Sequence, residues 1–354
     1  LELRLRRLTK FSLLELEQES DQLRKEIDQL QALLADEALL RTTVSRELGE
    51  VAKLHGTPRR SQIIDASGVE LSRKPVQVTE IEDSETFVTL SPLGGISRSD
   101  VPGIGTTLGT SLRKDVGLVL EDGRAIQVHV SDLPTQAIGS SAENDASEFL
   151  GLKTQVVGIV EWQSEKTYAL GTRSGVVKRI TCPLPDKHEV SLISLKEGDA
   201  LIGITETEAD ADLVFVTDNA SALIFSAEAV RPQGLAAAGM AGMNTADSRV
   251  IFFGSGNKDS SLLTAANNSQ ALGATDPGSC KLTPISAFPS KGRGSMGVRC
   301  QRLLKGEDQL YFAGLVSTEP VLLDSTGQTL EIPEIEPKRD ASGSTAPGYI
   351  QGAC

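Results

Sequence analysis

The chain has 354 residues, 35 of them Lys or Arg and 48 Asp or Glu, so its formal net charge is -13. This length exceeds what one small hydrophobic core supports, so we expect at least two structural units. With 39% hydrophobic and 23% charged residues, the composition is that of an ordinary soluble protein. No apolar run approaches the roughly 18 residues that a membrane helix needs, which excludes a membrane protein of that class.

Residues 1 to about 56 have a helical pattern with two apolar stripes that step by three, four or seven residues. Asp36 separates the stripes, and Gly56 and Pro58 supply a stop, so we predict an antiparallel coiled-coil hairpin over residues 1–60. The first stripe is Leu16, Leu23, Ile27, Leu30 and Leu34, and the second is Leu40, Val44, Leu48, Val51 and Leu54.

Two interpretations of this hairpin stay open. It is either a small helical subdomain that packs on the rest of the chain, or the base of an arm or dimer element. The first residues, "LELRLRRLTK", lack an initiator Met and a signal-peptide pattern and begin in mid-helix. We therefore expect the chain to be part of a longer protein.

After Pro58 the pattern changes to short β-type runs separated by glycine turns, and one unit recurs. The centres of the first runs are Val88, Val119, Ala169, Val214, Leu262 and Tyr311, at steps of 31, 50, 45, 48 and 49 residues. A period of about 40–50 residues built from strands and turns is typical of propeller blades. We predict six blades over residues 61–336, with an irregular first blade, and a flexible tail over residues 337–354 because of its small polar composition.

Motifs for catalysis or metal binding are missing from the sequence. "GIGTTLG" has the wrong glycine spacing for a dinucleotide site, and no phosphate-binding loop or Ser/His/Asp order is present. The four cysteines are far apart and have no histidine nearby, which excludes the familiar zinc spacings and suggests reduced thiols in a cytoplasmic protein. They are Cys182, Cys280, Cys300 and Cys354.

The cations of the β region are few and clustered, although this region carries the whole negative net charge. The richest cluster is "PSKGRGSMGVRCQRLLKGED", in which glycines alternate with basic residues. Glycine beside arginine lets the backbone approach a phosphodiester while the guanidinium binds a phosphate oxygen, although a solvated basic turn is the plainer interpretation. The candidate DNA-binding residues are Lys291, Arg293, Arg299, Arg302, Lys305, Lys178, Arg179, Arg231, Arg98, Arg113 and Lys114.

The β region resembles the C-terminal domain of the A subunits of bacterial type IIA DNA topoisomerases, a six-bladed β-pinwheel. The resemblance rests on "TRSGVVKRI", "FVTDNASALIFSAEAVRPQGLAAAGMAGM" and "PSKGRGSMGVRCQRLLKGED", which are similar to that family's blade strands and loops. The helical segment up to "HGTPRRSQI" is similar to the helices that lead from the family's C-gate through its coiled coil. The resemblance therefore covers nearly the entire chain.

Within this family, the A subunits of DNA gyrase carry a Gln-Arg-Arg-Gly-Gly-Lys-Gly box in the first blade, which they use to wrap DNA. The equivalent region here reads "SPLGGISRSDVPGIGTTLGTSLRKD" and lacks the box, which resembles the A subunits of topoisomerase IV of the actinobacterial type. The best remaining box-like loop is "KGRGSMGVR". None of Tyr168, Tyr311 and Tyr349 stands in the family's catalytic context, so this chain alone should not cut DNA.

The resemblance implies a DNA-binding function. The chain would hold and bend duplex DNA through phosphate contacts for ATP-dependent strand passage, meaning relaxation or decatenation. The resemblance also implies a homodimer of A subunits, an ATPase B subunit that partners it, and a cytoplasmic, nucleoid-associated enzyme. No cofactor is expected on this chain, and ATP and Mg are implied only for the whole enzyme. The alternative is a non-enzymatic, protein-interaction propeller that assembles through its coiled coil.

Overall fold

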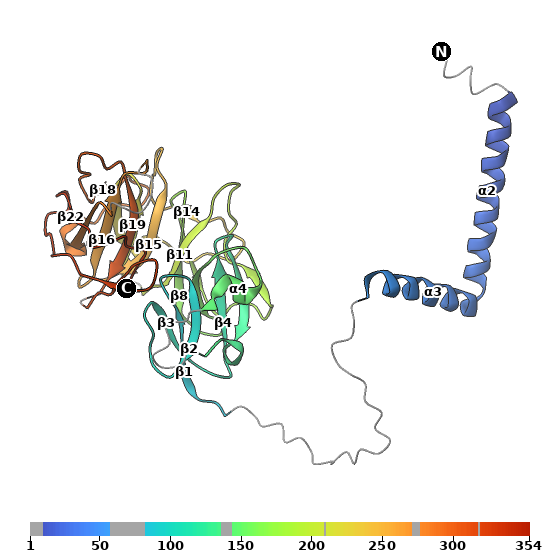
Figure 1. Ribbon diagram of the computed structural model, residues 1–354, viewed down its shortest axis with the longest axis horizontal. Coiled ribbons are helices and arrows are strands. Elements are labelled where there is room, and N and C mark those ends of the chain that lie inside the picture. Colours follow the sequence, from blue (N-terminus) through green and yellow to red (C-terminus); the bar gives the residue numbers. More distant parts are fainter. Residues whose placement is uncertain (1–9, 57–81, 136–143, 209, 271–276, 318) are drawn as a thin grey trace. The chain divides into compact units, whose positions relative to one another are not determined.

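The computed structural model describes residues 10–56, 82–135, 144–208, 210–270, 277–317 and 319–354 (Figure 1). Contacts divide the chain into two units, Leu1–Val78 and Thr79–Cys354. None of the helices in the described ranges is long and apolar enough to cross a membrane.

Two helices form the described part of the N-terminal unit, as predicted, and residues 1–9 and 57–60 of the predicted hairpin lie outside the described residues. Helix α2 is Lys10–Ala35 and helix α3 is Glu37–His55. The carboxylate of Asp36 accepts hydrogen bonds from the N–H groups of Ala38 and Leu39 at 2.9 and 3.3 Å, which satisfies the free donors at the start of α3. Gly56 ends α3 with a hydrogen bond from its N–H to Ala52 O.

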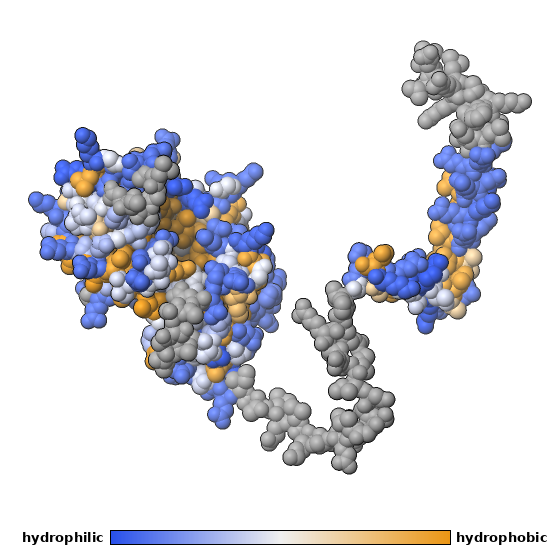
Figure 2. Space-filling model, viewed as in Figure 1, coloured by the Kyte–Doolittle hydropathy of each residue, from blue (hydrophilic) through white to orange (hydrophobic). Residues whose placement is uncertain are grey.

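The described apolar side chains of the two stripes, from Leu23 to Leu54, are exposed, so the mutual packing predicted for an antiparallel hairpin is not observed among them, and the side chain of Leu16 lies outside the described residues. Leu34 is 80% exposed, Leu54 is 79% exposed, and no described side chain of α3 is buried. These side chains form the orange patches on both helices in Figure 2. The periodic leucines specify two amphipathic helices, but helical periodicity does not specify which surface covers them.

The C-terminal unit is a six-bladed propeller with one antiparallel sheet per blade. Blade 1 has the order β3 (Thr106–Ser111), β1 (Glu85–Leu90), β2 (Gly95–Ser99) and β6 (Asn144–Asp145). Blade 2 has the order β7 (Val156–Glu161), β4 (Asp115–Leu120), β5 (Arg124–His129) and β10 (Glu189–Ser191). Blade 3 has the order β11 (Leu201–Glu206), β8 (Thr167–Thr172), β9 (Val176–Thr181) and β14 (Met240–Ala241).

The remaining blades follow the same order. Blade 4 contains β15 (Val250–Gly256), β12 (Asp212–Thr217), β13 (Ser221–Ser226) and β18 (Val298–Arg299). Blade 5 contains β19 (Gln309–Val316), β16 (Ser261–Asn267), β17 (Ser279–Pro284) and β22 (Ser344–Thr345). Blade 6 has three strands, β23 (Gly352–Ala353), β20 (Leu322–Leu323) and β21 (Thr329–Leu330). Short helices follow some strands: α4 (Ala146–Leu150), η1 (Val130–Asp132), η2 (Ala227–Ala229) and η3 (Ile285–Ala287).

Neighbouring blades exchange strands. After the hairpin of blade 2 (β4–β5), the chain returns to blade 1 as its outer strand β6 and then forms the inner strand β7 of blade 2. The same path repeats around the propeller. We call the segment that leads from each hairpin back to the previous blade a connector. The connectors are residues 130–143, of which the structure describes 130–135, and residues 182–188, 227–239, 285–297 and 331–343.

Strand exchange explains the irregular first repeat. Strand β3 follows β2 directly because no earlier blade precedes blade 1 to receive an exchanged strand, and this shortens the first step. Strand exchange also corrects the predicted centre of the sixth repeat. Tyr311 lies on the inner strand β19 of blade 5 and not in the hairpin of blade 6.

The tail predicted to be flexible is instead part of the fold. Strand β22 pairs with β17 of blade 5, and β23 pairs with β20 of blade 6. Ile350 is 1% exposed, and the rings of Tyr311 and Tyr349 stack at 4.4 Å. The composition of the tail was misleading because two-residue strands are ordered by the sheet edges that they join rather than by their own hydrophobic pattern.

The hydrophobic core lies between adjacent blades, in five clusters that each join neighbouring sheets. The first hairpin strands have apolar contacts on both faces; Leu118 to Leu120 of β4, for example, are fully buried. The inner strands surround a cavity of about 880 Å³. Its lining includes one or more residues from every blade: Thr106, Val156, Ile204, Phe253, Leu315 and Ala353.

Candidate nucleic-acid interface

The fourth connector carries the most basic surface loop of the propeller. Lys291, Arg293 and Arg299 are exposed there or at its end, and no acidic residue interrupts residues 285–299. A Cβ built on Gly292 or Gly294 would meet no atom within 4 Å, so this part of the backbone is open to solvent. A polyanion could therefore approach the main chain as well as the cationic side chains.

Hydrogen bonds fix the base of this loop against the previous blade. The N–H of Lys291 donates to Ile224 O at 2.9 Å, and the N–H of Gly294 donates to Gly242 O at 2.5 Å. Gly297 has φ +78°, and a Cβ there would lie 2.4 Å from Ala222 O, so only glycine fits where the loop rejoins the sheet. The loop is therefore open at its middle and closely packed at its end.

Arg293 joins the fourth connector to the third. Its Nε donates to Ala229 O at 3.1 Å and its Nη1 to Ala241 O at 3.0 Å, while the residue stays exposed overall. Exposed Arg231 lies two residues beyond Ala229. The structure thus connects Arg231, Lys291 and Arg293 through one hydrogen-bonded group of loops.

Arg302 and Arg299 adjoin the fifth connector. The N–H of Arg302 donates to Ala341 O at 3.0 Å, and Nη1 of Arg339 reaches Arg299 O at 3.4 Å. Lys338 is exposed next to Arg339. The sequence-based interpretation missed Lys338 and Arg339 because it treated the tail as flexible; the basic pair in "EPKRD" was the available signal.

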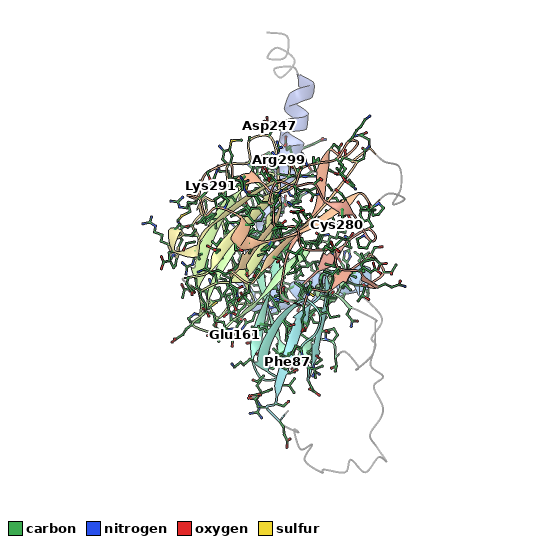
Figure 3. All side chains as sticks on the ribbon, turned by 90° about the vertical axis from the view of Figure 1, so that its left-hand side faces the viewer. Phe87, Glu161, Asp247, Cys280, Lys291 and Arg299 are labelled. Carbon is green, nitrogen blue, oxygen red and sulfur yellow. The ribbon has the colours of Figure 1, made fainter. Side chains whose placement is uncertain are left out.

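We call Arg231, Lys291, Arg293, Arg299 and Arg302 the basic surface. Lys305 is exposed too, but it lies in the turn before β19, where the N–H of Asp308 bonds to Asn267 O. Figure 3 shows Lys291 and Arg299 at one end of the propeller and Glu161 and Phe87 toward the other. Exposed Asp247 is at the same end as Arg299 in this view.

Lys178 and Arg179 do not form part of this surface, so their prediction as DNA contacts is wrong. Lys178 is 0% exposed, and its Nζ donates to the carbonyl oxygens of Leu192, Leu235 and Ala237 at 2.6, 2.9 and 2.8 Å. Arg179 is 8% exposed and donates from Nη1 to Ala227 O and Val230 O. Burial lowers the pKa of Lys178 to about 8. Strand β9 places both side chains beneath the third connector, which the local sequence does not reveal.

The candidates in the first two blades are separate from the basic surface. Arg98 is half-buried and its Nε donates to Leu133 O at 3.0 Å. Lys114 pairs with Glu161 at 3.3 Å, and Figure 3 shows Glu161 toward the end of the propeller away from Lys291. Arg113 is exposed, and its N–H donates to the carboxylate of Asp83.

Acidic residues border the basic surface. The fifth connector, which is hydrogen-bonded to Arg302 and Arg299, contains Glu331, Glu334, Glu336 and Asp340. Because the Debye length is about 8 Å at physiological salt, these carboxylates repel an anionic ligand only over short distances of that order. A polyanion would therefore be attracted along a narrow path.

The tyrosines of the chain have structural roles in the propeller. Buried Tyr168 accepts a hydrogen bond from the N–H of Glu161 at 3.0 Å, and burial raises its pKa. Tyr311 accepts from the N–H of Ile350 at 3.2 Å, and burial raises its pKa to about 12. In the described ranges, no group of three or more His, Cys, Asp or Glu side chains is placed to hold a metal ion.

Comparison with protein families finds one matching family model. The model described as the DNA gyrase C-terminal domain, beta-propeller, matches residues 211–253 and 272–313. These two segments contain all or part of most strands of blades 4 and 5, and the second segment includes the whole fourth connector.

Known proteins give a consistent result. The chain is 27% identical to the A subunit of DNA gyrase from Mycolicibacterium smegmatis over 359 residues, which cover 92% of this chain and 41% of the relative. It thus spans about two fifths of that relative's length.

Two solved structures share the fold. The C-terminal domain of DNA topoisomerase IV superimposes with a TM-score of 0.61 at 18% identity, over 78% of this chain and 94% of that domain. The DNA gyrase A C-terminal domain superimposes with a TM-score of 0.54 at 16% identity, over 76% of this chain and 99% of that domain.

Proposed function

We propose a function for this chain from the premise that it belongs to the family of the A subunits of DNA gyrase and topoisomerase IV, of which it carries the C-terminal β-propeller domain. The chain binds duplex DNA through its basic surface. The observation that carries this proposal is the acid-free stretch 285–299, formed by the fourth connector and β18, which exposes Lys291, Arg293 and Arg299 on an otherwise acidic protein.

The contacts made by this surface would be with phosphates. Lysine and arginine bind phosphate oxygens without recognising base sequence, so the chain would hold DNA of any sequence. The open backbone at Gly292 and Gly294 allows close approach of the duplex. Bending the duplex toward neighbouring connectors would cost elastic energy, and additional phosphate contacts would offset this cost.

The rest of the enzyme completes this function. We propose that the DNA held here is delivered for ATP-dependent strand passage by a homodimer of A subunits with an ATPase B subunit, in a cytoplasmic enzyme associated with the nucleoid. ATP and Mg would act on other parts of that enzyme. The missing gyrase box favours topoisomerase IV-like relaxation and decatenation over strong wrapping.

The salt dependence of DNA binding tests the proposal. We would measure the affinity of the full chain for a fluorescently labelled duplex by anisotropy at several salt concentrations. The double variant Lys291→Ala, Arg299→Ala should bind more weakly, and the slope of log affinity against log salt should decrease by about 2, from about 0.9 per lost phosphate contact.

Lys187→Ala is the matched control, because Lys187 is an exposed cation on the second connector beside Asp186. It should leave the slope nearly unchanged. Binding that does not depend on salt, or that is equal in wild type and the double variant, would contradict the proposal. Such a result would favour the alternative, a protein-interaction propeller.

A further inference from the structure

Two lysines are buried in the propeller and cannot contact DNA. Lys178 on β9 is 0% exposed and Lys281 on β17 is 2% exposed. A buried ammonium group is costly unless several acceptors surround it. Each ammonium group must therefore be identified with the acceptors to which it donates hydrogen bonds.

The two lysines occupy the same place in their blades. Each is the third residue after a glycine with positive φ at the hairpin tip, Gly175 at 83° and Gly278 at 70°. The corresponding residues of blades 1, 2 and 4 are Ser97, Ile126 and Leu223. A lysine is thus not required by the blade architecture itself, since other residue types fill this position elsewhere.

Lys178 holds the third connector. Two of its three acceptors, Leu235 O and Ala237 O, belong to this connector, at 2.9 and 2.8 Å. The neighbouring Arg179 binds Ala227 O and Val230 O at the start of the same connector. The segment "PQGLAAAG" has few side chains that could anchor it, so these donors set its path.

The fourth connector in turn rests on the third. Arg293 donates to Ala229 O and Ala241 O, at the two ends of the segment held by Lys178 and Arg179. The N–H of Asn244 donates to Ser295 O at 3.0 Å, just beyond that segment. The position of the loop that carries Lys291 and Arg293 therefore depends on the third connector.

Lys281 has the equivalent role on the other side. Its Nζ donates to Lys338 O at 3.2 Å and Arg339 O at 2.5 Å, both on the fifth connector. Arg339 then reaches Arg299 O at the end of the fourth connector. The two buried lysines thus hold the connectors on both sides of the basic loop.

We propose that Lys178 and Lys281 are positioning residues for DNA binding, each holding a connector in the conformation that supports the exposed cations of the basic surface. This inference rests on the proposed function. The lysines touch no phosphate; they act through carbonyl groups of the neighbouring connectors. Replacement by methionine keeps the length of the side chain and removes the ammonium donor, which leaves two or three partly buried carbonyl oxygens without that hydrogen bond.

The test uses two readouts on the full chain. Amide hydrogen exchange should accelerate about tenfold or more in residues 233–242 and 291–297 of Lys178→Met, and in residues 338–342 of Lys281→Met. In the anisotropy assay, each variant should bind labelled duplex about three- to tenfold more weakly, with a smaller salt slope, as expected when one phosphate contact is lost.

Val119→Ala is the control for a loss of stability alone. Val119 is fully buried between blades 2 and 3, and this change removes methyl groups but no hydrogen-bond donor. It should lower the unfolding temperature but leave connector exchange and DNA affinity near wild type. If Lys178→Met does not fold, Lys281→Met provides the same comparison on the other side of the loop.

Three results would overturn the inference: unchanged connector exchange in both methionine variants, faster exchange without weaker DNA binding, or an equal loss of DNA binding in Val119→Ala. A wild-type chain that binds no duplex would instead overturn the proposed function. The part of the inference that concerns DNA would be lost with it, whereas the exchange data would still decide whether the lysines hold the connectors.

Discussion

Cations occupy two contrasting settings in the propeller, the fourth connector and the second hairpin strands of blades 3 and 5. On the fourth connector and the strand β18 that follows it, Lys291 and Arg299 are exposed. On the strands, Lys178 and Lys281 are surrounded by carbonyl oxygens and nearly inaccessible. The same cationic side chains are thus exposed in one setting and bonded to backbone carbonyl oxygens in the other. The difference is whether a connector covers them.

The largest effect that we expect concerns the glycines of the fourth connector. Gly297→Ala should lower the free energy of unfolding by about 2–4 kcal/mol, because its positive φ and the Ala222 carbonyl leave no room for a Cβ. Urea unfolding followed by the fluorescence of Trp162, which is the single tryptophan and is fully buried, measures this change.

Gly292→Ala is the companion variant in the open part of the same connector. It should change stability by no more than about 0.5 kcal/mol, since a Cβ there meets no atom within 4 Å. Equal costs for the two glycines would contradict the division of this connector into an open middle and a packed end.

A second, smaller effect concerns pH. Burial lowers the pKa of Lys178 to about 8 from its usual 10.5. Between these values the unfolded chain keeps a proton that the folded chain has lost, so this contribution to stability rises with pH. From about pH 7.5 to about pH 9.5, wild type should gain about 2 kcal/mol relative to Lys178→Met.

The comparison with Lys178→Met is needed because other groups act in the opposite direction. Burial raises the pKa of Cys280 to about 11, so ionisation of this thiol in the unfolded chain lowers stability at high pH. That contribution is common to both proteins and cancels in the difference. The same pH dependence in Lys178→Met and wild type would show that the buried ammonium is not the titrating group.

The smallest effect distinguishes two exposed arginines. Arg293→Ala should destabilise the chain by about 1 kcal/mol, because the guanidinium donates to Ala229 O and Ala241 O. Arg231→Ala should be nearly neutral, since no hydrogen bond from its side chain is found within the described ranges. Both should weaken DNA binding, so thermal unfolding and anisotropy together separate the structural role of Arg293 from its charge.

Part of the candidate site was predictable from sequence because it is local. In "KGRGSMGVR", alternating glycines and cations predict an exposed loop, and Lys291, Arg293 and Arg299 are exposed there. The roles of Lys178 and Arg179 were not predictable in this way, since their acceptors lie 14 to 59 residues away along the chain. Lys338 and Arg339 were missed because their segment is ordered by distant sheet edges.

The sequence by itself determined the repeat, the number of blades, the two helices separated at Asp36 and the basic loop, because each depends on periodicity, capping or local composition. Only the tertiary structure decided that neighbouring blades exchange strands and that the last residues complete blades 5 and 6. It also decided which cations face solvent. The physical reason is that burial and partnering of a charged side chain depend on backbone carbonyl groups brought from elsewhere in the chain.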